Sequence, residues 1–239
     1  MKKLALLSLP LLIAACGGGG DSSSSSSAPT LNLNAAYVAY IKNGSSTTST
    51  ISGYCAGTAR VTDSAAYSGK NYDGVAALIV NNSEVDTVAA NSPALCSNIF
   101  NSNEGGQVYK KFYDPTTLLP INEGGSQKWE IYSGQQALPS SVTAGTQGTF
   151  YNLTDYKGGS SPVTSGVVTY AVTSDTASTL FVTMTETVKL VANGAPYYTA
   201  NTVFRLNANN TLSQVSKKIQ AYPAATGTTE LSVTTTVVN

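Results

Sequence analysis

An alternation of apolar residues with threonine recurs along the C-terminal part of this chain, and it constrains the fold more than any other feature. In segment 179–190, Leu180, Val182 and Met184 alternate with Thr183 and Thr185. Side chains alternate between the two faces of a strand, so this pattern predicts a strand with one apolar and one polar face. Similar segments follow one another between turn residues. We expect strands at 148–157, 167–173, 179–190, 197–206, 212–222 and 230–238.

Asn193-Gly194 lies between two of these segments and is a strong hairpin signal, because a type I′ turn needs positive φ at both central residues. A two-residue turn would place Glu186, on the apolar face, opposite Asn201. A carboxylate on that face has two interpretations. It is either a buried acid with a raised pKa or a residue at the margin of the sheet, and the sequence favours the margin.

The N-terminal part predicts one short helix followed by weaker strands. Apolar residues from Leu33 to Ile41 recur at spacings of three and four, and Asn43-Gly44 is a suitable helix stop. Strand-like segments follow at 49–62, 74–80, 84–88, 108–113 and 129–132. We therefore predict a mainly β protein, with antiparallel meander or sandwich-like sheets and one short N-terminal helix.

The first residues have the composition of a secretory signal. Lys2 and Lys3 precede an apolar run at 4–13, which is too short to span a bilayer. The run closes on Ile13, Ala14, Ala15 and Cys16, which resembles the lipobox of bacterial lipoproteins. This resemblance implies that Cys16 is the first mature residue and carries the lipid that attaches the protein to a membrane. The alternative is an ordinary signal with an incidental cysteine.

Residues 16–30 consist of Cys16 and a Gly/Ser tract that predicts a flexible tether. In lipoproteins of Gram-negative bacteria, an aspartate directly after the lipidated cysteine retains the protein at the inner membrane. Gly17 holds that position here, so the resemblance implies the outer membrane, at either its periplasmic or its surface face. We divide the chain into a signal peptide (1–15), the lipidated tether (16–30), a helix-plus-β subdomain with a disulfide (31–137) and an antiparallel β-meander subdomain (138–239).

A wider resemblance begins at Lys110. It covers an aromatic and Asp-Pro segment, a Gly-Gly pair, the Trp129–Tyr132 segment, a Leu-Pro-Ser-Ser-Val run and a terminal meander ending in Phe-Arg-Leu. This arrangement resembles a group of uncharacterised β-rich lipoproteins of Gram-negative bacteria. The group brings no catalytic residues, so the resemblance implies only a fold and a location.

Composition excludes several classes of function. Without Lys2 and Lys3 of the signal, 11 basic residues face 13 acidic ones, so the mature chain has no net positive charge with which to attract nucleic acid. The chain contains no histidine, which removes the usual zinc ligand and the general base of Ser-His and Cys-His enzymes. Glu84 and Asp86 supply too few oxygens for calcium. We expect no metal and no cofactor.

Cys55 and Cys96 remain once Cys16 is assigned to the lipid, and an even pair in an exported chain predicts a disulfide. We expect Cys55 on a strand and Cys96 in or beside the loop after Pro93. The alternative, a catalytic thiol, lacks a base to activate it.

The sequence therefore favours a non-catalytic lipoprotein with a structural or ligand-binding β domain, whose partner is the membrane and a protein or glycan ligand. The alternatives are a glycoside hydrolase, which needs only two suitably spaced carboxylates, and a carbohydrate-binding module with an aromatic face. No catalytic residue is assigned. The candidate ligand-binding residues are Trp129, Tyr132, Tyr109, Tyr113 and Glu186.

Overall fold

The computed structural model describes residues 29–94, 96, 107–125, 128–156, 159–222 and 231–238. One helix, α1 (Leu33–Asn43), precedes the strands. The strands are β1 (Ser45–Gly53), β2 (Gly57–Asp63), β3 (Tyr67–Lys70), β4 (Ala76–Val88), β5 (Gln107–Tyr113), β6 (Pro120–Gly124), β7 (Lys128–Ser133), β8 (Gln147–Asp155), β9 (Thr164–Ser174), β10 (Leu180–Leu190), β11 (Pro196–Leu206), β12 (Leu212–Ala221) and β13 (Leu231–Val237). The predicted mainly β class with one short N-terminal helix is confirmed.

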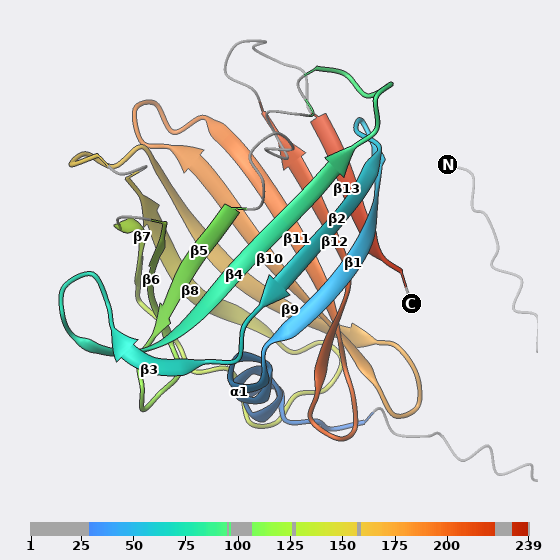
Figure 1. Ribbon diagram of the computed structural model, residues 1–239. Helices are drawn as coiled ribbons and strands as arrows, with labels where there is room; N and C mark the ends of the chain where they lie inside the picture. The colour runs from blue at the N-terminus through green and yellow to red at the C-terminus, as the bar shows by residue number, and fades with distance from the viewer. Residues whose placement is uncertain are drawn as a thin grey trace, which may run out of the picture.

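The strands form one antiparallel sheet that closes on itself (Figure 1). Neighbouring strands from β4 to β13 pair in chain order, β13 pairs with β1, and β1 pairs with β2. Pairing of β2 with β4 joins the two ends, so that within the described residues twelve strands make a barrel. The short β3 pairs with the start of β4 beyond the end of β2. The prediction of a meander or sandwich-like arrangement is wrong in this respect.

Closure has a physical cause that local pattern does not reveal. Alternation fixes which side chains share a face, but it does not say whether the first and last strands meet. A strongly twisted sheet with this many strands curls, and joining its edges satisfies backbone groups that an open sheet would leave unpaired. The predicted subdomain boundary at 137/138 falls between β7 and β8, which pair directly with one another.

Helix α1 lies across one end of the barrel, the lower end in Figure 1. Asn32 caps its first turn by accepting a hydrogen bond from the backbone N–H of Ala35 at 2.8 Å. Gly44 ends it, as predicted, with φ of 71°. A side chain at Gly44 would place its Cβ 2.5 Å from the backbone oxygen of Asp63, so glycine is required where the chain turns from the helix into β1.

The main core fills the barrel beside this helix. Leu33 and Ala36 of α1 are fully buried against inward-facing residues of the strands. Leu180, Val182 and Val188 of β10 belong to the same core, which confirms their predicted apolar face. Burial of each such aliphatic side chain contributes about 1.5–3 kcal/mol, so this core is what holds the helix on the barrel end.

The β10–β11 connection differs from the predicted two-residue turn. β10 ends at Leu190 and β11 begins at Pro196, and of the two central residues only Gly194 has positive φ. The backbone N–H of Gly194 donates to the carbonyl oxygen of Leu190, which makes a wider turn than type I′. The register therefore shifts, and Glu186 pairs with Ala200 rather than Asn201.

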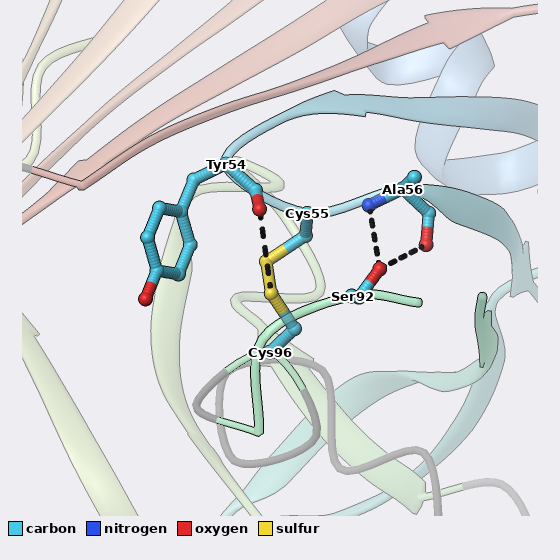
Figure 2. Close-up of a disulfide and its surroundings, with 5 residues drawn as sticks. All are labelled: Tyr54, Cys55, Ala56, Ser92 and Cys96. Carbon is cyan, nitrogen blue, oxygen red and sulfur yellow. Dashed lines mark hydrogen bonds between the residues drawn. A yellow bond between two sulfur atoms is a disulfide. The ribbon is translucent and has the colours of Figure 1, made fainter. Parts of the chain in front are cut away.

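The predicted disulfide between Cys55 and Cys96 is present, with its Cα atoms 5.7 Å apart (Figure 2). The predicted strand at 49–62 is two strands, β1 and β2, and Cys55 lies in the turn between them rather than on a strand. Cys96 follows Pro93, as expected, and its backbone N–H donates to the Pro93 carbonyl oxygen. Ser92 adds a second tie, because its hydroxyl hydrogen-bonds both the N–H and the carbonyl of Ala56. The bridge thus fastens the β4–β5 connection to the β1–β2 turn.

The predicted signal peptide, Cys16 and the tether up to residue 28 lie outside the described residues. In the part of the chain that the structure describes, no helix is long and apolar enough to cross a membrane.

Candidate functional site

A cavity of about 420 Å³ lies inside the barrel, next to the apolar core. Tyr37, Tyr40 and Ile41 of α1 line it, so the helix closes the cavity at one end. The Tyr37 ring meets Phe150 of β8 edge-on at 5.2 Å, and Tyr40 meets Phe204 of β11 at 5.8 Å. A cavity of this size falls in the range of small-molecule sites, about 300–1,000 Å³.

The cavity wall carries more acids than bases. Five carboxylates and two lysines line it among the described residues: Asp63, Glu84, Glu123, Glu130, Glu186, Lys111 and Lys217. If all were ionised, the formal charge of the wall would be 2 minus 5, or −3. Charged groups in an enclosed space interact strongly because little water screens them, so this imbalance shapes what the cavity can accept.

Glu123 of β6 and Glu130 of β7 are joined through one hydroxyl. The oxygen of Tyr132 lies 3.0 Å from a carboxylate oxygen of each. A tyrosine hydroxyl has a single proton and can donate it to only one of them. The other contact is satisfied when the second carboxyl group is protonated and donates to the tyrosine oxygen. The geometry therefore predicts one neutral acid in this pair.

The pKa shifts identify the neutral acid as Glu130. Burial, followed by the charges of Glu123 and Glu186, raises the pKa of Glu130 to about 8. Burial also raises the pKa of Glu186, although a hydrogen bond from the Tyr198 hydroxyl opposes the shift. Carboxylates from β6, β7 and β10 thus interact across the cavity, and at neutral pH Glu130 holds a proton.

Asp63 of β2, elsewhere on the cavity wall, already has hydrogen-bond and ion-pair partners for its carboxylate. Asn82 donates to its carboxylate at 2.8 Å, Ser45 donates at 3.3 Å, and the Lys111 ammonium lies 3.6 Å away. Burial alone would lower the pKa of Lys111, but Asp63 and Glu123 outweigh it and hold that pKa above the usual range. Asp63 and Lys111 therefore form an internal ion pair that is already neutralised.

Asp86, two residues beyond Glu84 on β4, is an acid with an incompletely satisfied carboxylate. One of its carboxylate oxygens is buried and has no hydrogen bond within the described residues. Burial and the neighbouring Glu84 raise its pKa to about 7, while Lys217 opposes the shift. Asp86 therefore titrates close to neutral pH rather than in the acid range.

Four of the five candidate ligand-binding residues come together in this cavity: Tyr109, Tyr113, Tyr132 and Glu186 all line it. Trp129 is not part of the lining, but its ring packs against that of Tyr109, which does line the cavity, with the ring centroids 5.2 Å apart. The preference for Glu186 at a sheet margin is wrong, because closure of the barrel turns the apolar face of β10 inward.

Sequence reasoning missed Glu123, Glu130, Lys111 and Tyr198 as members of the site. One signal was present: Glu130 and Tyr132 are two apart in β7 and so share a face with a candidate residue. A polar face is usually the exposed one in an open sheet, whereas in a barrel with a polar interior it can face inward.

The described residues contain no group of three or more His, Cys, Asp or Glu side chains placed to hold a metal ion. The hydrolase alternative stays a prediction. The two carboxylates joined by Tyr132 are no further apart than twice 3.0 Å, but that hydroxyl stands between them, where a glycosidic bond would have to lie.

No protein-family model matches the chain, and no curated protein or solved structure matches it either.

Proposed function

We propose that this protein is a non-catalytic, lipid-anchored protein of the cell envelope whose barrel binds a small molecule in its interior. The observation that supports ligand binding is the cavity of about 420 Å³ that Tyr37 and Tyr40 close at one end. A structural role alone would be served by an interior filled with side chains, as in barrels without a ligand.

The wall of the cavity has the composition of a ligand site. Tyrosine rings supply apolar faces, while a few carboxylates and lysines converge from different strands. Binding sites in proteins combine these two features, since apolar area supplies affinity and a few polar groups fix orientation. The polar groups are also pre-organised: Tyr132 and Tyr198 hold three of the glutamates by hydrogen bonds before any ligand arrives.

Filling the cavity should abolish binding. Thr202 of β11 lines the cavity and pairs with Met184 and Lys217 on the neighbouring strands. We expect Thr202→Trp to reduce binding of the neutral fluorophore N-phenyl-1-naphthylamine by at least about tenfold, because the indole would occupy the ligand space. Fluorescence titration of the mature domain measures this.

Thr199→Trp is the matched control, since Thr199 lies on the outward face of the same strand. It should leave the fluorophore affinity unchanged. Equal binding by wild type and both variants, with unfolding transitions intact, would show that the fluorophore does not enter the cavity and would contradict the proposal.

The envelope location rests on the signal-like segment and Cys16, which the lipobox resemblance assigns to lipid. We expect radiolabelled palmitate to be incorporated into the wild-type protein and the label to be lost in Cys16→Ser, since no thiol would remain at the processing site. Membrane fractionation should place the wild type with the outer membrane. Labelling that persists in Cys16→Ser would contradict the anchor.

A further inference from the structure

We propose that the barrel cavity is selective for a small organic cation, an amine with an apolar or aromatic body, over neutral and anionic molecules of the same size. This inference rests on the proposed ligand-binding function and names the chemical class of its ligand. Three observations support it. They are the negative charge of the cavity wall, the Tyr113 hydroxyl that faces the cavity, and the proton held within the glutamate cluster, which consists of Glu123, Glu130 and Glu186.

The unneutralised charge of the wall is negative. Lys111 pairs with Asp63 and also acts on Glu123 and Glu186, so Lys111 and Lys217 together offset only part of the charge of the five carboxylates. Lys217 makes no ion pair within 4.0 Å in the described part of the chain and acts on Glu186 and Asp86 only at longer range. An anionic ligand would add to the repulsion among these acids, whereas a cation would relieve it.

The tyrosines supply a second, independent indication of a ligand. Tyr113 is only 9% exposed, lines the cavity, and its hydroxyl has no hydrogen bond within the described residues. The fully buried side-chain atoms without a partner do not include this hydroxyl, so it is open to the cavity, where a ligand or water can complete its hydrogen bonds. Its oxygen can accept from an ammonium N–H, and the neighbouring tyrosine rings offer faces that attract cations.

The glutamate cluster couples binding to a proton. Glu130 holds a proton at neutral pH because neighbouring carboxylates and burial disfavour its charged form. A bound ammonium would supply the missing positive charge and lower the pKa of Glu130, so the proton would leave as the cation enters. The cation and the proton therefore compete for the same negative site.

Groups on several strands act on Glu130 and set this exchange. The titratable side chains that interact with it from its own and the surrounding strands are Glu123, Tyr132, Tyr151, Asp155, Glu186 and Tyr198. The tyrosines stay protonated throughout, since burial raises the pKa of Tyr132 and of Tyr198 well above the usual value. The carboxylates alone exchange protons as the cation binds.

The experiment is isothermal titration calorimetry of the mature domain with three probes that share a phenethyl group and differ in the charge of the group attached to it. Phenethylammonium is the cation, 2-phenylethanol the neutral probe and 3-phenylpropionate the anion. We expect the cation to bind at least about tenfold more tightly than either, and its affinity to rise at least about tenfold between roughly pH 6 and pH 8.5. Titrations in two buffers of different ionisation enthalpy should show release of about one proton per bound cation at neutral pH.

Glu130→Gln keeps the shape of the side chain but has no proton to release. It should bind phenethylammonium about tenfold more weakly at roughly pH 8.5, with no dependence on pH from this group. Asp114→Asn, in the exposed β5–β6 turn, removes the same charge outside the cavity and should match wild type. Tighter binding of 2-phenylethanol or 3-phenylpropionate, or no binding of the cation to protein that still binds the neutral fluorophore, would overturn the cation class and leave the cavity as a ligand site. Fluorophore binding that is insensitive to Thr202→Trp would instead overturn the proposed function itself.

Discussion

Removal of the Cys55–Cys96 disulfide is expected to lower the free energy of unfolding by about 4 kcal/mol. The two cysteines are 41 positions apart, and the chain between them contains β2, β3 and β4. Without the bridge, the unfolded chain gains the conformational freedom of that loop, which is the physical origin of the loss. Urea unfolding of the Cys55→Ser/Cys96→Ser double variant should show a midpoint lower by about 1–2 M.

The comparison is made in a Cys16→Ser background, in which Cys55 and Cys96 are the remaining cysteines of the chain. Addition of a reductant should move the parent protein to the midpoint of the double variant and should leave the double variant unchanged. A parent protein with the same midpoint in the presence and absence of reductant would show that the bridge contributes no stability.

Replacement of Glu130 by glutamine is expected to stabilise the protein at about pH 8 by an amount on the order of 2 kcal/mol, with no gain at about pH 5. Glu130 has a folded-state pKa of about 8, above its ordinary value of 4.5. Between these two values the folded protein binds more protons than the unfolded chain, so the contribution of Glu130 to stability falls as pH rises through this window. Glutamine has no charge to bury, and its amide can donate to the Tyr132 oxygen as the neutral acid does.

Thermal unfolding of wild type and Glu130→Gln across this pH range measures the effect. Asp86, with a pKa of about 7, adds its own loss of stability as pH rises, so the informative quantity is the difference between the two proteins. Asp114→Asn gives a control of opposite sign: hydrogen bonds from Thr117 hold the pKa of Asp114 below its usual value, so its contribution is present above the unfolded pKa and lost on acidification. If the difference in stability between Glu130→Gln and wild type were the same at about pH 5 and at about pH 8, that result would contradict a buried acid at this position.

Local features of the fold could be predicted because they depend on neighbouring residues. The spacing of Leu33 to Ile41 and the Asn43-Gly44 stop gave α1, and the alternation in β10 gave the buried face of Leu180, Val182 and Val188. Closure could not be predicted, since the pairing of β2 with β4 depends on the accumulated twist of strands across the whole sheet. The turn between β10 and β11 was misjudged because Asn-Gly also fits a longer connection in which Gly194 alone takes positive φ.

Part of the candidate site could also be predicted, because some of its residues depart from the local pattern around them. Glu186 stood out because a carboxylate interrupts an apolar face, and Tyr132 because it belongs to an aromatic segment. Glu130 did not stand out by itself, because a charged residue on a polar face is ordinary in an open sheet, and only its shared face with Tyr132 linked it to the site. Its role follows only from closure, which brings β6, β7 and β10 around one cavity and places three glutamates within electrostatic reach of one another.

The most direct test of this account is a site-resolved NMR titration of the glutamate side-chain carboxyl carbons in the mature domain, with the Glu130 resonance assigned from its absence in Glu130→Gln. Glu130 lies inside a closed barrel among other carboxylates, and we expect its carboxyl carbon to titrate with a pKa of about 8. Addition of phenethylammonium should lower that value. A Glu130 carboxyl group that titrates at its ordinary value of 4.5, with or without the amine, would contradict the enclosed acidic cavity on which the proposed function rests.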